Sequence, residues 1–142
     1  MHKPEVFLVD DNQGDGLLLD LAFAEVGRTV EIVQARDGVE AFDFLRTVAC
    51  HEPFPFQLII IDLNLPRMNG LELLLGLLDL PALIWVPMVI LTTSPTAHER
   101  ERILDLHCTL LMKPDDYGGL GAVVAQLIPY LFSADPELLE AG

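Results

Sequence analysis

The feature that most limits how this chain can fold is a short apolar run, Leu58 to Ile61, that ends in the acidic residue Asp62. Three of its four residues are isoleucine, and Pro66 follows soon after. A short β-branched run bounded by turn residues predicts a strand buried on both faces, as in parallel sheets covered by helices. Ligands of such sheets bind outside the carboxyl ends of the strands. Asp62 therefore stands where chemistry is usually found, although an acid there can equally be a turn or cap residue.

Four further strand patterns alternate with helix patterns along the chain. The strands are predicted at Glu5 to Asp11, Val30 to Val33, Met88 to Thr92 and Thr109 to Met112. The helices are predicted at about Leu18 to Val26, Ala41 to Ala49, Gly70 to Leu80, Ala97 to Leu106 and Leu120 to Leu131. Five alternations require right-handed crossovers, and they predict an α/β fold with a doubly wound five-stranded parallel sheet. Pro129 predicts a kink or an early stop in the last helix.

The composition excludes several classes of function. The chain has 142 residues, enough for one domain, and a net charge of -14 from 22 acidic and 8 basic residues. Such a field repels phosphate backbones, so we expect no direct nucleic-acid binding. The longest apolar stretch, Leu71 to Val89, is interrupted by Gly76, Asp79 and two prolines, so no membrane span is expected. The N-terminus has no signal-peptide pattern, and we expect a cytoplasmic protein.

Five polar side chains are predicted to meet at one edge of the sheet, because each lies at or just after the end of a strand. They are Asp10, Asp11, Asp62, Thr92 and Lys113. Three clustered carboxylates repel one another unless a cation joins them, and Mg²⁺ suits hard oxygen ligands of this kind. A hydroxyl and a lysine at the same point indicate an anionic group that must be held. The set predicts phosphoryl transfer with Asp62 as the nucleophile.

Four motifs in this order carry a family resemblance: Val9-Asp10-Asp11-Asn12, Asp62 to Gly70, Leu91-Thr92-Thr93-Ser94 and Lys113-Pro114. Over about Glu5 to Leu131 the chain resembles the receiver domains of two-component response regulators. The residues in its motifs are most similar to those of single-domain regulators associated with phytochrome-type histidine kinases. The resemblance implies a flavodoxin-like (βα)5 fold with strand order 2-1-3-4-5. It also implies a receiver domain at residues 1–132, followed by a short acidic tail at 133–142 rather than an output domain.

The resemblance also assigns roles. It implies that Asp62 is the phosphoacceptor, Thr92 the switch hydroxyl and Lys113 the phosphoryl-contacting lysine. It implies an Mg²⁺ site formed by Asp10, Asp11, Asp62 and the backbone carbonyl of Asn64. Such a protein is not a turnover enzyme on a separate substrate, but a phosphoacceptor that assists its own phosphotransfer and dephosphorylation. The implied partner is a sensor histidine kinase or a phosphotransfer protein.

One position departs from the family pattern. The family usually has Tyr or Phe three residues before the lysine, and this chain has Leu110 there. The stretch from Leu106 to Thr109 also looks one residue short. These departures keep open a second hypothesis, a constitutive interaction protein with a receiver fold that no longer switches. A third, an aspartyl phosphohydrolase, is disfavoured because Asn64, not a second carboxylate, follows Asp62 by two residues.

The first and third helices have more apolar residues than one buried face needs. The side of the first helix expected to face the sheet carries Leu18, Ala22, Phe23 and Val26. Separate second sets are Leu17, Leu21 and Ala24 on the first helix and Leu73, Leu77 and Leu80 on the third. These sets are either a wider buried stripe or an interaction face. The family resemblance implies that the first helix faces the kinase, which makes Leu17 and Leu21 the expected docking contacts. The spare leucines and the tail also make a homodimer an open expectation.

Overall fold

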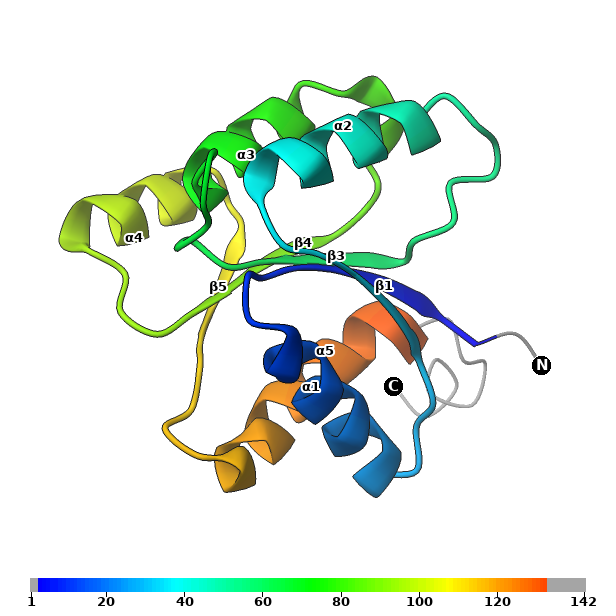
Figure 1. The fold of residues 1–142 in the computed structure, drawn as a ribbon, viewed down its shortest axis with the longest axis vertical. Coiled ribbons are helices and arrows are strands. Elements are labelled where there is room, and N and C mark those ends of the chain that lie inside the picture. Colours follow the sequence, from blue (N-terminus) through cyan, green and yellow to red (C-terminus); the bar gives the residue numbers. More distant parts are fainter. Residues whose placement is uncertain (1–2, 133–142) are drawn as a thin grey trace.

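The computed structural model describes residues 3–132, which form a parallel sheet of five strands in the order β2-β1-β3-β4-β5. The strands are β1 (Glu5–Val9), β2 (Glu31–Ala35), β3 (Leu58–Ile61), β4 (Met88–Thr92) and β5 (Thr109–Met112). The helices are α1 (Gln13–Glu25), α2 (Gly38–Val48), α3 (Gly70–Leu78), α4 (Ala97–Asp105) and α5 (Leu120–Phe132). Figure 1 shows α2, α3 and α4 covering one face of the sheet, and α1 and α5 covering the other. The predicted fold class and strand order are therefore confirmed.

The middle of the sheet is buried on both faces, as the isoleucine run predicts. All four residues of β3 are fully buried, and β3 pairs with β1 on one side and β4 on the other. The pairing places Val9 beside Ile61 and Ile61 beside Ile90. Because the strands are parallel and in register, the residues that follow them emerge at one edge of the sheet.

Two separate cores lie on the two faces, one under α2, α3 and α4 and the other under α1 and α5. In α1 the buried residues are Gly16, Leu19, Ala22 and Phe23. The predicted inner face is correct for Ala22 and Phe23, which are buried, and wrong for Leu18 and Val26, which are 40% and 49% exposed. Leu17 and Leu21 are also exposed, at 66% and 55%, so they form a surface and not a wider buried stripe. In α3 the buried-stripe interpretation is correct, since Leu73 and Leu77 are fully buried.

The last helix does not stop early at its proline. α5 continues through Pro129 to Phe132, and Pro129 itself is exposed. The predicted tail at 133–142 lies outside the described residues. Within residues 3–132, no helix combines the length and the apolar character that crossing a bilayer requires.

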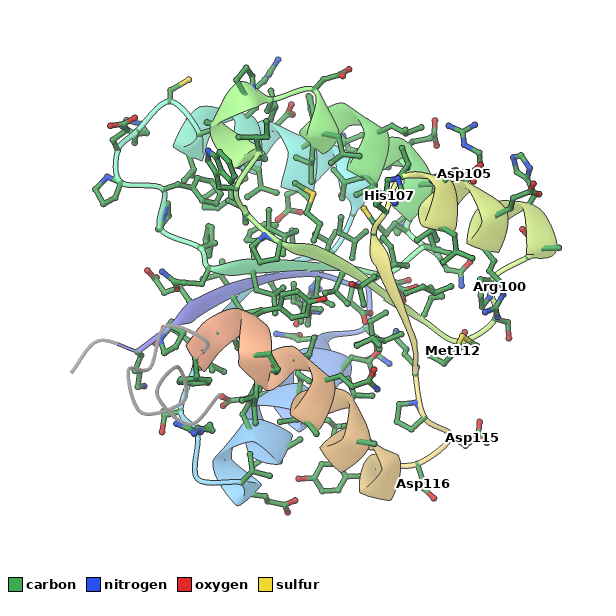
Figure 2. All side chains as sticks on the ribbon, turned by 180° about the vertical axis from the view of Figure 1, so that it is seen from behind. Arg100, Asp105, His107, Met112, Asp115 and Asp116 are labelled. Carbon is green, nitrogen blue, oxygen red and sulfur yellow. The ribbon has the colours of Figure 1, made fainter. Side chains whose placement is uncertain are left out.

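The edge of the sheet at β5 is short and flanked by charge. β5 has four residues and is followed by Lys113, Pro114 and two acids. Figure 2 shows Met112 on this strand, Arg100 on the neighbouring α4, and Asp115 and Asp116 in the loop after β5. Short edge strands with adjacent proline and charges resist pairing with other sheets. Met112 is 44% exposed on this edge strand, which charged residues flank.

Candidate functional site

The structure brings the three predicted acidic residues together at the carboxyl ends of β1 and β3. A carboxylate oxygen of Asp10, one of Asp11 and one of Asp62 all lie within 4.8 Å of one another. Asp10 and Asp62 are buried, with 2% and 6% exposure, whereas Asp11 is open to solvent. The backbone N–H of Asp62 donates to the Val9 carbonyl at 2.9 Å, which ties the two strand ends to each other.

Lys113 is the cation at the centre of this site. Its Nζ lies 2.7 Å from Asp62 Oδ2, 2.8 Å from Asp10 Oδ2 and 2.9 Å from Asp15 Oδ2. Its backbone N–H donates to the Thr92 carbonyl at 2.8 Å, so β4 and β5 hold it at the same edge. Burial alone would lower the pKa of Lys113, but the hydrogen bonds to Asp10, Asp62 and Asp15 raise that pKa above its ordinary value. The ammonium is therefore charged at neutral pH.

Two further donors hold the other oxygen of Asp62. The Thr92 hydroxyl donates to Asp62 Oδ1 at 3.1 Å, and Thr92 is completely buried. The backbone N–H of Asn64 donates to the same oxygen, also at 3.1 Å. Asn64 itself is exposed in the loop after β3. Asp62 is thus oriented from both sides, by a hydroxyl and an amide at one oxygen and by an ammonium at the other.

Close backbone packing fixes the loop that carries Asp62. Gly70 begins α3 directly against this loop, and a Cβ at that position would lie 2.2 Å from the Asp62 carbonyl oxygen. The Gly70 N–H donates to the Leu63 carbonyl at 3.0 Å. Asn69 caps α3 through a capping box with Glu72. A glycine here lets the helix start close enough to the strand end to hold Asp62 in place.

The acidic cluster has the chemistry of a divalent-cation site. Burial raises the pKa of Asp10 to about 6, although hydrogen bonds from Lys113 and from the Asn12 backbone lower it. A raised carboxyl pKa means that the ionised form is destabilised where it stands, and an added positive charge would stabilise it. Oxygen ligands from Asp10, Asp11 and Asp62 fit a hard divalent cation.

One residue at the site was missed by the sequence reasoning. Asp15 lies in the first turn of α1 and contacts Lys113, although it follows no strand. An acid in the first turn of a helix is ordinarily explained by its favourable interaction with the helix dipole. That explanation gives no reason to expect a further role in the site. The signal that could have found it is the third acid in the stretch Asp10 to Asp15, five residues after a predicted ligand.

The position that departs from the family pattern is filled by an aliphatic side chain. Leu110 lies in β5 beside Ile90 and is half-buried against the core under α2, α3 and α4. The neighbouring Thr109 hydroxyl forms a 2.7 Å hydrogen bond with the Tyr130 hydroxyl of α5. β5 is thus linked to α5 by a polar contact, while an aliphatic residue replaces the aromatic side chain typical of the family.

Two sequence relatives match most of the chain. The chain is 32% identical to a probable methanogenesis regulatory protein FilR2 of Methanothrix harundinacea over 130 residues, covering 88% of this chain and 81% of the relative. It is 33% identical to the response regulator Rcp1 of a Synechocystis species over 103 residues, covering 72% of this chain and 70% of the relative.

Solved structures extend the likeness to three dimensions. The phosphorylated cyanobacterial phytochrome response regulator RcpA superposes with a TM-score of 0.80 at 32% identity, covering 93% of this chain and 96% of the other. The Mn²⁺-bound form of Rcp1 superposes with a TM-score of 0.76 at 29% identity, covering 94% and 96%. The model of the response regulator receiver domain matches residues 6–123. With that match over most of its length, the chain belongs to the response regulator receiver domain family.

Proposed function

We propose that this chain is a stand-alone response regulator that accepts a phosphoryl group on Asp62 from a histidine kinase and signals by altered protein contacts. The observation that carries the proposal is that both carboxylate oxygens of Asp62 are hydrogen-bonded. Oδ1 accepts from the Thr92 hydroxyl at 3.1 Å, and Oδ2 lies 2.7 Å from Lys113 Nζ. A nucleophilic carboxylate with a hydroxyl and an ammonium beside it can place and neutralise an incoming phosphoryl group. Similarity to RcpA and Rcp1 supports this function.

The proposed transfer moves one phosphoryl group between two side chains. An Asp62 oxygen attacks the phosphorus of a phosphohistidine, so a P–O bond forms, the P–N bond breaks and the imidazole leaves with the bonding electron pair. Lys113 and Thr92 would contact the oxygens of the transferred group. A bound Mg²⁺ would supply positive charge that offsets the phosphoryl oxygens, and its proposed ligands are Asp10, Asp11, Asp62 and the backbone carbonyl of Asn64.

The proposal extends to the boundaries and the place of action of the protein. The receiver domain would span residues 1–132, with residues 133–142 as a short tail. We propose the cytoplasm as its location and no direct contact with nucleic acid, which the net charge of -14 supports. Receiver domains interact with histidine kinases or phosphotransfer proteins, and a homodimer is a further proposed contact.

The first test is phosphorylation by a small phosphodonor with Mg²⁺. We expect one acid-stable, base-labile phosphate per chain, located by mass spectrometry on the peptide that contains Asp62. Light scattering of the same samples would report whether the oligomer changes with phosphorylation. The absence of an adduct at saturating donor would contradict the proposal and would favour a constitutive interaction protein, for which Leu110 is the motivation. Sustained turnover of a small phosphoester would instead favour a phosphohydrolase.

The exposed leucines of α1 supply a test of the proposed partner. Leu17 and Leu21 lie one turn apart on α1, the helix that also carries Asp15 into the site. With Leu17→Glu and Leu21→Glu combined, we expect phosphotransfer from a phosphohistidine donor protein to slow at least about tenfold, because two apolar contacts are replaced by charges. The rate with a small phosphodonor should not change, since neither residue touches the site.

A matched control uses a leucine that is equally exposed elsewhere. Leu104 lies on α4 and is 59% exposed. Leu104→Glu should leave phosphotransfer from the same donor protein unaltered. If the α1 double variant also transferred at the wild-type rate, the α1 surface would not be the docking site.

A further inference from the structure

Lys113 has one more carboxylate partner than the proposed phosphotransfer requires. An ammonium group has three N–H donors, and Lys113 directs them to Asp10, Asp62 and Asp15. Asp62 is the proposed nucleophile, and Asp10 and Asp62 are both proposed cation ligands. Asp15 is neither, and its side chain is 31% exposed, compared with 2% for Asp10 and 8% for Asp62.

The backbone of Asp15 is fixed relative to the sheet. Asn12 caps α1, and the Asp15 N–H donates to the Asn12 carbonyl at 3.1 Å. The Gln34 side chain reaches from β2 and donates to the Asp10 carbonyl at 2.8 Å and to the Asn12 carbonyl at 3.1 Å. The start of α1 is therefore attached to both β1 and β2, and the Asp15 carboxylate lies at a set position beside Lys113.

The ammonium and a divalent cation would compete for the same oxygens. Lys113 Nζ is within 2.8 Å of Oδ2 of both Asp10 and Asp62, and the same two residues belong to the acidic cluster with Asp11. Two positive groups that share two carboxylates repel each other, so each weakens binding of the other. A third carboxylate, that of Asp15 at 2.9 Å from the ammonium, offsets that repulsion and draws the ammonium toward α1.

We propose that Asp15 is a positioning residue that holds Lys113 toward α1, so that the ammonium and a divalent cation can share Asp10 and Asp62. The inference rests on the cation site of the proposed function. It connects α1 to the phosphoacceptor through Lys113, in addition to the exposed leucines of that helix.

The experiment is a calorimetric titration of the unphosphorylated protein with Mg²⁺ at neutral pH. Asp15→Asn keeps the size of the side chain and removes its charge, and we expect its Mg²⁺ affinity to fall about tenfold, which corresponds to about 1.4 kcal/mol. Asp15→Glu restores the charge and should recover most of the affinity. Asp20→Asn removes an exposed acid from the same helix, and its Mg²⁺ affinity should stay near that of the wild type.

A double-mutant cycle separates positioning of the lysine from a direct effect of charge. Lys113→Met removes the competing ammonium and should itself tighten Mg²⁺ binding. In that background Asp15→Asn should change the affinity less than about twofold, because no lysine is left to hold. A full tenfold loss in both backgrounds would mean that Asp15 acts on the cation directly, and it would overturn the proposal.

Two other outcomes separate this inference from the proposed function. Wild-type affinity in Asp15→Asn, with normal Mg²⁺ binding in the wild type, would overturn the role of Asp15 and leave the cation site intact. No Mg²⁺ binding by the wild type would overturn the cation site and this inference together. Thermal unfolding without Mg²⁺ would establish that each variant is folded at the temperature of the titration.

Discussion

Asp62→Asn is expected to take up no phosphate from a small phosphodonor with Mg²⁺, under conditions that phosphorylate the wild type. A carboxamide is a far weaker nucleophile than a carboxylate, so the step that forms the P–O bond is lost. Asparagine has nearly the same shape, and its side-chain oxygen can still accept from Thr92 and from the Asn64 N–H, as Asp62 Oδ1 does at 3.1 Å. Intact-protein mass spectrometry measures the uptake.

The matched control for this variant is an acid away from the site. Asp43 lies on α2, where its exposed carboxylate pairs with Arg46 at 3.4 Å. Asp43→Asn should be phosphorylated to the wild-type extent. Phosphate uptake by a folded Asp62→Asn protein would place the acceptor elsewhere, with Asp10 and Asp11 as the nearest candidates. Circular dichroism would exclude unfolding as the cause of a negative result.

The sheet could be predicted because the local sequence defines most of its strands. β3, β4 and β5 begin and end at the predicted residues, since turn residues and prolines bound their apolar runs. Strand alternation then fixes a parallel sheet, because each crossover needs a helix. The boundaries were less accurate in β1, where the structure ends the strand at Val9 and leaves Asp10 and Asp11 in the loop.

The phase of α1 could not be predicted from its sequence. Leu17, Leu18, Leu19 and Leu21 offer apolar residues on nearly every side of this helix. The structure buries Leu19 and exposes the other three. Packing of α1 against the sheet and α5 determines which of these leucines is buried. A helix with apolar residues on nearly every side has no clear periodic signal that could identify its inner face.

The site residues also divide into those that the sequence could predict and one that it could not. Thr92 ends a strand, and Asp10, Asp11, Asp62 and Lys113 follow strands, so sheet topology alone brings them to one edge. Asp15 follows a helix cap, and its distance from Lys113 depends on how the start of α1 packs against Gln34. Neither local pattern nor topology contains that information.

Lys113→Met is expected to destabilise the cation-free protein by about 3 kcal/mol at about pH 7.5, because removal of one partner leaves buried carboxylates without a counter-charge. The raised pKa of Lys113 in the folded state means that its stabilisation is fully present below the ordinary lysine pKa, which includes neutral pH. Lys3→Met is the matched control. Lys3 is 55% exposed and lies 4.0 Å from Glu31, so its loss should cost less than about 0.5 kcal/mol.

The destabilisation caused by Lys113→Met should become smaller as the pH is lowered. The titration of Asp10 sets the direction of this pH dependence. Burial raises the pKa of Asp10 to about 6 even with Lys113 present, so the folded protein binds a proton there more tightly than the unfolded chain does. Stability therefore falls as the pH rises from the ordinary carboxyl range through about 6. Without the lysine the pKa of Asp10 rises further, and this fall becomes larger and extends to higher pH.

Denaturant titrations of both proteins at about pH 5 and about pH 7.5 would measure the difference. At the lower pH, Asp10 carries its proton in the folded variant, so the wild type and Lys113→Met should differ much less than at the higher pH. Added Mg²⁺ at the higher pH should restore part of the lost stability, since a bound cation neutralises the same carboxylates. An equal loss at both pH values would mean that packing of the lysine stem, and not its charge, stabilises this edge of the sheet.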